Sequence, residues 1–139
     1  MKKSVMLALF VACTLFSSAQ PESKGLKDAY KDYFSVGVAI NSRNLSHPEE
    51  MALVKSNFNS ITCENEMKPI SVHPSEGVWQ WAAADSIANF CRRNGIKLRG
   101  HCLAWHNQFC DWMLRDKKGR MVKKEVFYRR LREHIHTVV

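Results

Sequence analysis

Short apolar runs that are rich in β-forming residues alternate along this chain with longer segments of helical periodicity. The runs occupy residues 34–40, 58–63 and 96–106, and each is typical of a buried strand. A helical pattern follows each run. Because neighbouring parallel strands must be joined by a long crossover, usually a helix, this alternation predicts an α/β protein with a parallel sheet and helices packed outside it.

The helical segments carry recognisable boundary signals. The first is expected to begin near Pro48, with Ser46 as a candidate cap and two glutamates in its first turn. The second covers residues 81–94, where apolar side chains recur every three or four positions and a glycine follows. The third begins near Lys123, beyond a turn at residues 117–119. The segments between these elements are expected to be loops.

The amino-terminal segment, residues 1–19, is typical of a secretory signal peptide. Two lysines precede an apolar run over residues 5–16, and small side chains lead up to Ala19. Cleavage there would leave residues 20–139 in a secreted or periplasmic location. An alternative is a lipid anchor on Cys13, because residues 10–13 loosely resemble a lipoprotein cleavage site that lacks the preferred leucine. Without that lipid, no membrane association is expected.

The basic excess of the chain is concentrated in one segment. After cleavage the net charge would be +6, and residues 115–132 alone hold nine Lys or Arg and two acids, a net of +7. Such a run could bind phosphates, but we favour the solvated outer face of an amphipathic helix. Because the sequence has no zinc-finger spacing and no helix-turn-helix or RNA-binding motif, we expect no nucleic-acid partner.

The cysteine pattern and the strand ends give no indication of a metal or cofactor site. No two cysteines are separated by two residues, and no glycine-rich phosphate loop follows a strand, so we expect neither a metal nor a cofactor. Export would permit disulfides, with Cys102 and Cys110 the closest pair in sequence. Single cysteines in apolar runs are more often small buried side chains, and we favour that interpretation for Cys63, Cys91, Cys102 and Cys110.

Polar side chains gather where the second and third runs end. The first group offers a carboxylate, an amide and a cation, which suit vicinal hydroxyls, and the second adds an aromatic face on which a sugar ring could stack. Each residue alone is more often a solvated loop residue, but (β/α)8 barrels build their active sites at the carboxyl ends of adjacent strands. The candidate site residues are Glu64, Asn65, Lys68, His101, Trp105, His106 and Gln108.

The length of the chain limits how much of such a barrel it can form. A complete barrel needs about 250 residues, so residues 20–139 supply three of the eight βα units. The sequence also stops within a helical pattern, with no glycine, proline or cap after it. The expected fold is therefore the first three βα units of a truncated (β/α)8 barrel, and we expect the chain to be a truncated product or a fragment.

Three motifs stand out in the sequence: residues 58–68, residues 74–79 with Ala84 and Asp85, and residues 94–108. In order and spacing they resemble motifs of the glycoside hydrolase family 10 endo-β-1,4-xylanases, and the resemblance runs from about Phe34 to the end of the chain. It implies that residues 20–139 are the amino-terminal part of a catalytic domain that cleaves internal bonds of xylan with retention of configuration. In the family, the two catalytic glutamates follow the fourth and seventh strands, so both would lie beyond Val139.

The resemblance also implies roles for the candidate residues. Glu64, Asn65 and Lys68 would bind xylose hydroxyls on the non-reducing side of the cleaved bond. His101, Trp105 and Gln108 would line the subsites at and beside that bond. Glu64 and Glu66 do not suit a catalytic pair, because two residues at one strand end cannot flank a bond from both faces. We therefore expect no catalytic residue and no activity in this chain alone. The alternative is a non-catalytic carbohydrate-binding fragment.

The implied partner is xylan or a xylo-oligosaccharide, and the complete protein is expected to be a monomer. The sequence departs from the family pattern at Cys110, where a proline commonly precedes the tryptophan matched by Trp112, and at Cys91 and Cys102, often Ala and Thr. Six other apolar side chains were assigned to packing: Met51, Leu53, Val54 and Phe90 to the core, and Trp79 and Trp81 to the core or to loop packing.

Overall fold

A parallel three-stranded sheet forms one end of the molecule. The computed structural model describes residues 24–139, so the predicted signal peptide and Cys13 lie outside the described residues. The strands are β1 (Gly37–Ile40), β2 (Ser60–Cys63) and β3 (Lys97–Arg99), in the order β1-β2-β3. Both pairings are parallel, which confirms the arrangement that the strand and helix alternation predicts.

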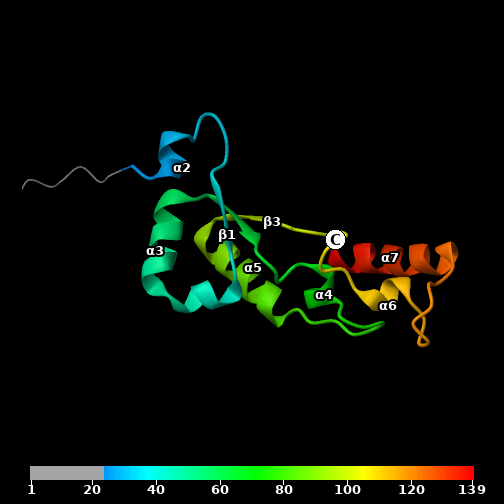
Figure 1. The fold of residues 1–139 in the computed structure, drawn as a ribbon. Coiled ribbons are helices and arrows are strands. Elements are labelled where there is room, and N and C mark those ends of the chain that lie inside the picture. Colours follow the sequence, from blue (N-terminus) through cyan, green and yellow to red (C-terminus); the bar gives the residue numbers. More distant parts are fainter. Residues whose placement is uncertain (1–23) are drawn as a thin grey trace, which may run out of the picture.

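Helices join the strands and follow the last of them (Figure 1). The three longer ones are α3 (Pro48–Asn57), α5 (Ala82–Asn94) and α7 (Lys124–Val138). Figure 1 shows α3 and α5 beside the sheet, whereas α7 lies at the opposite end with two short helices, α4 and α6. The short elements are α2 (Leu26–Ala29), the 3-10 helix η2 (Ser42–Ser46), α4 (Pro69–Val72) and α6 (Asp111–Leu114). Within residues 24–139, no helix has the length and apolar character needed to span a membrane.

Most of the predicted boundaries agree with the structure. Helix α3 begins with Pro48, and α5 ends at Gly95, whose φ of 64° is the left-handed conformation that favours glycine at a helix end. The hairpin after α6 turns at Gly119. The prediction for Ser46 was wrong: this residue ends η2, where its hydroxyl donates to the Arg43 carbonyl at 2.7 Å, and His47 occupies the cap position without a side-chain hydrogen bond.

The third strand is shorter than predicted. Its pairing with β2 extends only to Arg99, which lies opposite Thr62. From Gly100 onward the chain leaves the sheet, and β2 itself ends at Cys63, the position opposite Gly100 in this register, so residues 101–106 have no ladder partner. The apolar composition of residues 96–106 does not indicate where the pairing ends. The short helices η2, α4 and α6 also lie in predicted loops, since four or five residues are too few for a helical period.

The main core lies between the sheet and the two helices α3 and α5. Ile40 and Ile61 of the strands contact Val54 of α3 and Ile87 of α5 in one buried cluster. Met51 is also buried and Phe90 packs against the cluster, so these predictions are confirmed. The prediction for Leu53 was wrong, because its side chain is 61% exposed. Two residues correspond to more than half a helical turn, so Leu53 faces away from Met51.

The first predicted strand is less buried than expected. Only Ile40 of β1 is fully buried, and Phe34, which precedes the strand, is 59% exposed. The physical reason is that β1 is an edge strand within residues 24–139, paired only with β2.

The cysteines of the described chain are all free, so the possible Cys102–Cys110 disulfide is not formed. Cys63, Cys91 and Cys110 are buried, as predicted, and Cys102 is partly exposed. Burial, with a smaller contribution from Glu66, raises the pKa of Cys63 to about 12. These thiols therefore act as small core side chains rather than as reactive groups.

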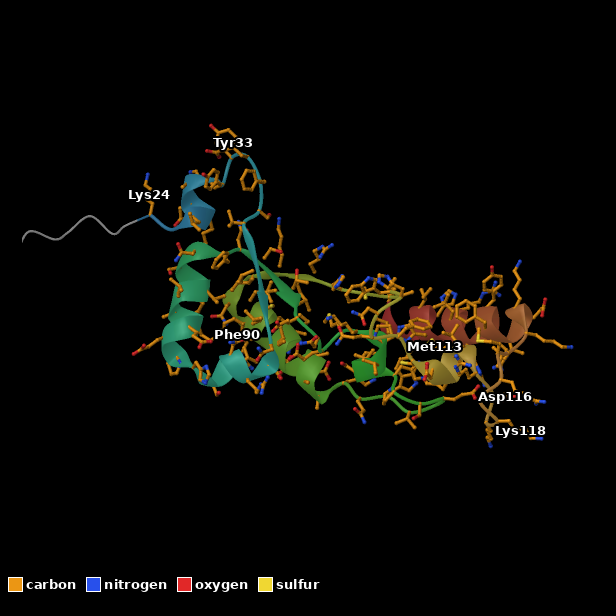
Figure 2. The ribbon with its side chains drawn as sticks, in the orientation of Figure 1. Lys24, Tyr33, Phe90, Met113, Asp116 and Lys118 are labelled. Carbon is orange, nitrogen blue, oxygen red and sulfur yellow. The ribbon has the colours of Figure 1, made fainter. Side chains whose placement is uncertain are left out.

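The basic segment lies mainly at the surface, as expected for a solvated face. Lys118 and Asp116 are on the hairpin that projects beyond α6 (Figure 2). Arg130 is different: its side chain is only 12% exposed and pairs with Glu76 at 2.8 Å. Its guanidinium also donates to the Trp112 carbonyl and lies over the Trp112 ring. Arg130 thus holds α7 against the segment that contains α6.

Candidate functional site

A buried lysine joins the two groups of candidate residues. Lys68 is only 9% exposed, and its ammonium donates to Asn65 Oδ1 at 2.9 Å and to Gln108 Oε1 at 2.5 Å. The Gln108 amide in turn donates to Asn65 Oδ1 at 3.3 Å. The structure therefore brings Asn65 and Lys68, which follow β2, into direct contact with Gln108, which comes 40 residues after Lys68.

The partners of the Lys68 ammonium are neutral groups. In the described part of the chain no carboxylate forms an ion pair with it, and its partners are two amide oxygens and the ring of Trp105, whose centroid lies 5.3 Å from Nζ. An ammonium has three donors, and two are used here. The third can donate to a ligand oxygen, which makes Lys68 suited to binding a hydroxyl group.

Trp105 supplies the aromatic surface of this region. It is 36% exposed, and the rings of His101 and His106 lie 6.0 and 5.4 Å from it between centroids. Lys68 and His101 thus both lie near the ring of Trp105. His106 is exposed, and its ring meets that of Trp105 edge-on. An exposed indole flanked by hydrogen-bonding groups can accept the apolar face of a sugar ring.

Glu64 is exposed and meets a residue that the sequence analysis missed. Asn41 Nδ2 donates to Glu64 Oε2 at 3.2 Å. Asn41 follows β1 directly, just as Glu64 follows β2, and the carboxyl ends of parallel strands meet at one edge of a sheet. The position of Asn41 at a predicted strand end was the available signal, but it was assigned only to a loop.

Glu66 has a structural environment rather than a catalytic one. Its carboxylate is buried and accepts the backbone N–H of Ser42 at 2.6 Å and that of Asn65 at 3.1 Å. Burial favours a higher pKa for this carboxyl, but the backbone N–H groups outweigh it, and the pKa is lowered. A carboxylate that is ionised and engaged on both oxygens cannot serve as a proton donor, which supports the rejection of a Glu64–Glu66 catalytic pair.

The candidate site consists of hydrogen-bonding side chains around one aromatic ring. Among residues 24–139, no group of three His, Cys, Asp or Glu side chains could hold a metal ion. The structure brings together Asn65, Lys68, Trp105 and Gln108, with His101 beside the tryptophan. Glu64 lies next to Asn65 and points to Asn41. Hydrogen-bonding groups and one exposed aromatic face are the features of a small polar binding surface for a carbohydrate.

Parallel strands joined by helices are the arrangement of a (β/α)8 barrel. The chain belongs to glycosyl hydrolase family 10, whose family model matches residues 25–139. The βα units described above are the first three of that family's barrel.

Individual relatives agree with this assignment. The chain is 61% identical, over its whole length, to an endo-1,4-beta-xylanase/feruloyl esterase of Xylanibacter ruminicola, and 43% identical, over 86% of its length, to endo-1,4-beta-xylanase A of Thermotoga maritima. Among solved structures it is similar to a psychrophilic family 10 endo-beta-1,4-xylanase, with a TM-score of 0.81 and 52% identity over 84% of the chain. A mutant in complex with xylotriose gives a TM-score of 0.78 at 37% identity, over 82% of the chain.

The chain spans only part of these proteins. It covers 20% of the X. ruminicola relative, 12% of the T. maritima relative and 36% and 34% of the two structures.

Proposed function

We propose that the protein to which this chain contributes is an endo-1,4-β-xylanase that hydrolyses internal β-1,4-xylosidic bonds of xylan with retention of configuration. The observation that carries the proposal is the 61% identity, over the entire chain, to the X. ruminicola protein with that activity in its name. A xylotriose complex among the similar structures supports a xylo-oligosaccharide as the ligand. We propose that the complete protein acts as a monomer.

In this proposal, residues 24–139 contribute the glycone side of the substrate site. Lys68, Asn65 and Gln108 present an ammonium and two amides to vicinal hydroxyls, and Glu64 offers a carboxylate acceptor beside them. The ring of Trp105 supports the apolar face of a xylose unit. His101 lies beside that ring, and in this proposal it lines a subsite at or beside the bond to be cleaved. The two carboxylates of a retaining mechanism, acid/base and nucleophile, are contributed from outside these residues.

A chimera tests the proposal directly. In the chimera, this chain replaces the corresponding segment of the X. ruminicola relative. Release of reducing sugar from xylan is measured for the chimera and, separately, for the 139-residue chain alone. The chimera should hydrolyse xylan, because it combines the binding residues with both catalytic carboxylates. The chain alone should release nothing, even from an activated aryl xylobioside, whose good leaving group relaxes the need for a general acid.

Two results would contradict the proposal. A folded chimera that binds xylo-oligosaccharides without hydrolysis would favour a non-catalytic carbohydrate-binding protein. Aryl release by the chain alone, above that of a variant with Glu64→Gln and Glu66→Gln, would restore these two glutamates as a catalytic pair.

We also propose that the protein is exported and that cleavage after Ala19 leaves Gln20 as the first residue of the mature chain. The support is the basic, apolar and small-residue succession of residues 1–19, and xylan is a polymer that meets an enzyme outside the cell. Mass spectrometry of the protein from its native host should give the mass that begins at Gln20, in the extracellular or periplasmic fraction. A diacylglycerol on Cys13 would instead establish a lipid anchor.

A further inference from the structure

Two fully buried histidines contact each other in the described part of the chain. The side chains of His73 and His134 are 0% exposed, and their Nδ1 atoms lie 3.3 Å apart. The ring of His73 stacks on Trp79 with centroids 3.6 Å apart and meets Trp112 edge-on at 4.6 Å. None of the roles assigned above to the candidate site residues involves this pair.

The contact between the two Nδ1 atoms restricts their protonation. A hydrogen bond between two ring nitrogens needs a proton on one of them and a free lone pair on the other. In the neutral state one histidine must therefore carry its proton on Nδ1 and the other on Nε2. Neither Nε2 atom forms a hydrogen bond of normal geometry among the described residues, and the Leu103 carbonyl is the backbone group that interacts with the His134 ring.

The pair lies at a junction that joins both halves of the site. His73 ends the segment that begins at Lys68, and its carbonyl accepts the indole N–H of Trp112 at 2.9 Å and the thiol of Cys110 at 3.2 Å. Closer to the site, the Ile70 N–H donates to the Gln108 carbonyl at 3.3 Å. Residues 68–73 and 108–112 therefore run against each other, with the Lys68–Gln108 hydrogen bond at one end and the histidines at the other.

Helix α7 contacts both of these segments. His134 belongs to α7, so the contact with His73 ties the helix to the segment that follows Lys68. Arg130, one turn earlier, binds the Trp112 carbonyl and Glu76 from the same helix. Figure 1 shows α4, α6 and α7 gathered at one end of the molecule, where these contacts occur.

We infer that His73 and His134 are positioning residues: a neutral pair of opposite tautomers whose hydrogen bond keeps residues 68–73 against residues 108–112 and so holds Gln108 on Lys68. The structural part of this inference is independent of the activity. The effect on xylan hydrolysis rests on the proposed function.

The surroundings of the pair favour the neutral state. Burial lowers the pKa of both rings from 6.5, and the neighbouring His73 lowers that of His134 further. Three groups act in the opposite direction. The carboxylates of Glu133 and Glu76 raise the pKa of His73, and the Leu103 carbonyl raises that of His134. Glu76 is itself neutralised by Arg130 at 2.8 Å, and the Cys110 thiol stays protonated because burial raises its pKa.

The direction of the pH dependence follows from these shifts. Below about pH 6.5 the unfolded chain binds protons that the folded chain excludes. The contribution of the pair to stability is therefore complete above that pH, and it declines as the pH falls through the lowered pKa values.

Tautomers can be measured on the chain itself. Histidine is labelled with ¹⁵N, and the ring nitrogens of His73 and His134 are assigned with the single variants His73→Gln and His134→Gln. At pH 7.5, above the ordinary histidine pKa of about 6.5, both rings should be neutral, one with a protonated Nδ1 and the other with a protonated Nε2. Two protonated rings, or two rings of the same tautomer, would overturn the inference.

The positioning role is tested in the chimera by a double-mutant cycle with Lys68→Met. His134→Leu should raise KM for xylan about tenfold with a smaller effect on kcat, and His134→Gln, whose amide can still donate or accept, should recover most of the loss. In the Lys68→Met background, His134→Leu should have little further effect on KM.

Fully additive losses would show that the pair does not act through the Lys68–Gln108 contact. An unchanged KM in a folded His134→Leu variant would show that the pair has no positioning role. If tautomers are as expected but hydrolysis is absent from the unmutated chimera, the proposed function fails and the structural inference stands.

Discussion

Replacing Lys68 with methionine should lower kcat/KM of the chimera on xylan by about 10- to 100-fold. Methionine retains an unbranched side chain of similar length, so packing is largely conserved. The change removes the ammonium that donates to Asn65 and Gln108 and that faces the ring of Trp105. Hydrogen bonds to a charged group contribute about 1.5–3 kcal/mol, which corresponds to this range of rate constants.

The control for this variant is Lys118→Met, because Lys118 is an exposed lysine on the hairpin beyond α6 (Figure 2). It should leave kcat/KM unchanged. Circular dichroism of both variants establishes that the fold is intact. A folded Lys68→Met variant with normal kcat/KM would show that the ammonium does not contact substrate.

Replacing Ile87 with alanine should lower the free energy of unfolding by about 2–5 kcal/mol. Ile87 is 0% exposed and lies where α5 meets Ile40, Ile61 and Val54, so the variant loses apolar contacts and leaves a cavity. Urea unfolding followed by circular dichroism gives the difference in free energy.

Leu53→Ala is the matched control, since it removes a similar side chain from a helix at a site that is 61% exposed. We expect its effect to stay within about 0.5 kcal/mol. Equal losses in the two variants would mean that Leu53 is buried in solution, as its sequence pattern had suggested.

These two residues show what a hydrophobic pattern can and cannot predict. Ile87 belongs to a run of apolar positions at helical spacing, and the structure buries it. Leu53 lies between two buried residues in sequence, Met51 and Val54, but points away from them. In a helix of ten residues, three apolar side chains are too few to define which side of the helix faces the core.

The candidate site was predictable in part. Glu64, Asn65 and Lys68 follow a strand, and so their position at one edge of the sheet could be predicted. That Gln108 would meet Lys68 could not, because 40 residues separate them and β3 ends well before the loop that carries Gln108. Asn41 and the His73–His134 contact were missed for the same reason, since each depends on partners distant in the sequence.

The sequence by itself determined the succession of strands and helices, the family and the group of polar residues after β2. Those properties depend on side-chain periodicity, the backbone preferences of glycine and proline, and short motifs, all of which act between neighbours in the chain. Only the tertiary structure decided where β3 ends, which apolar side chains are covered and which nitrogen atoms of His73 and His134 face each other. Such outcomes depend on contacts between segments that approach one another only when the chain folds.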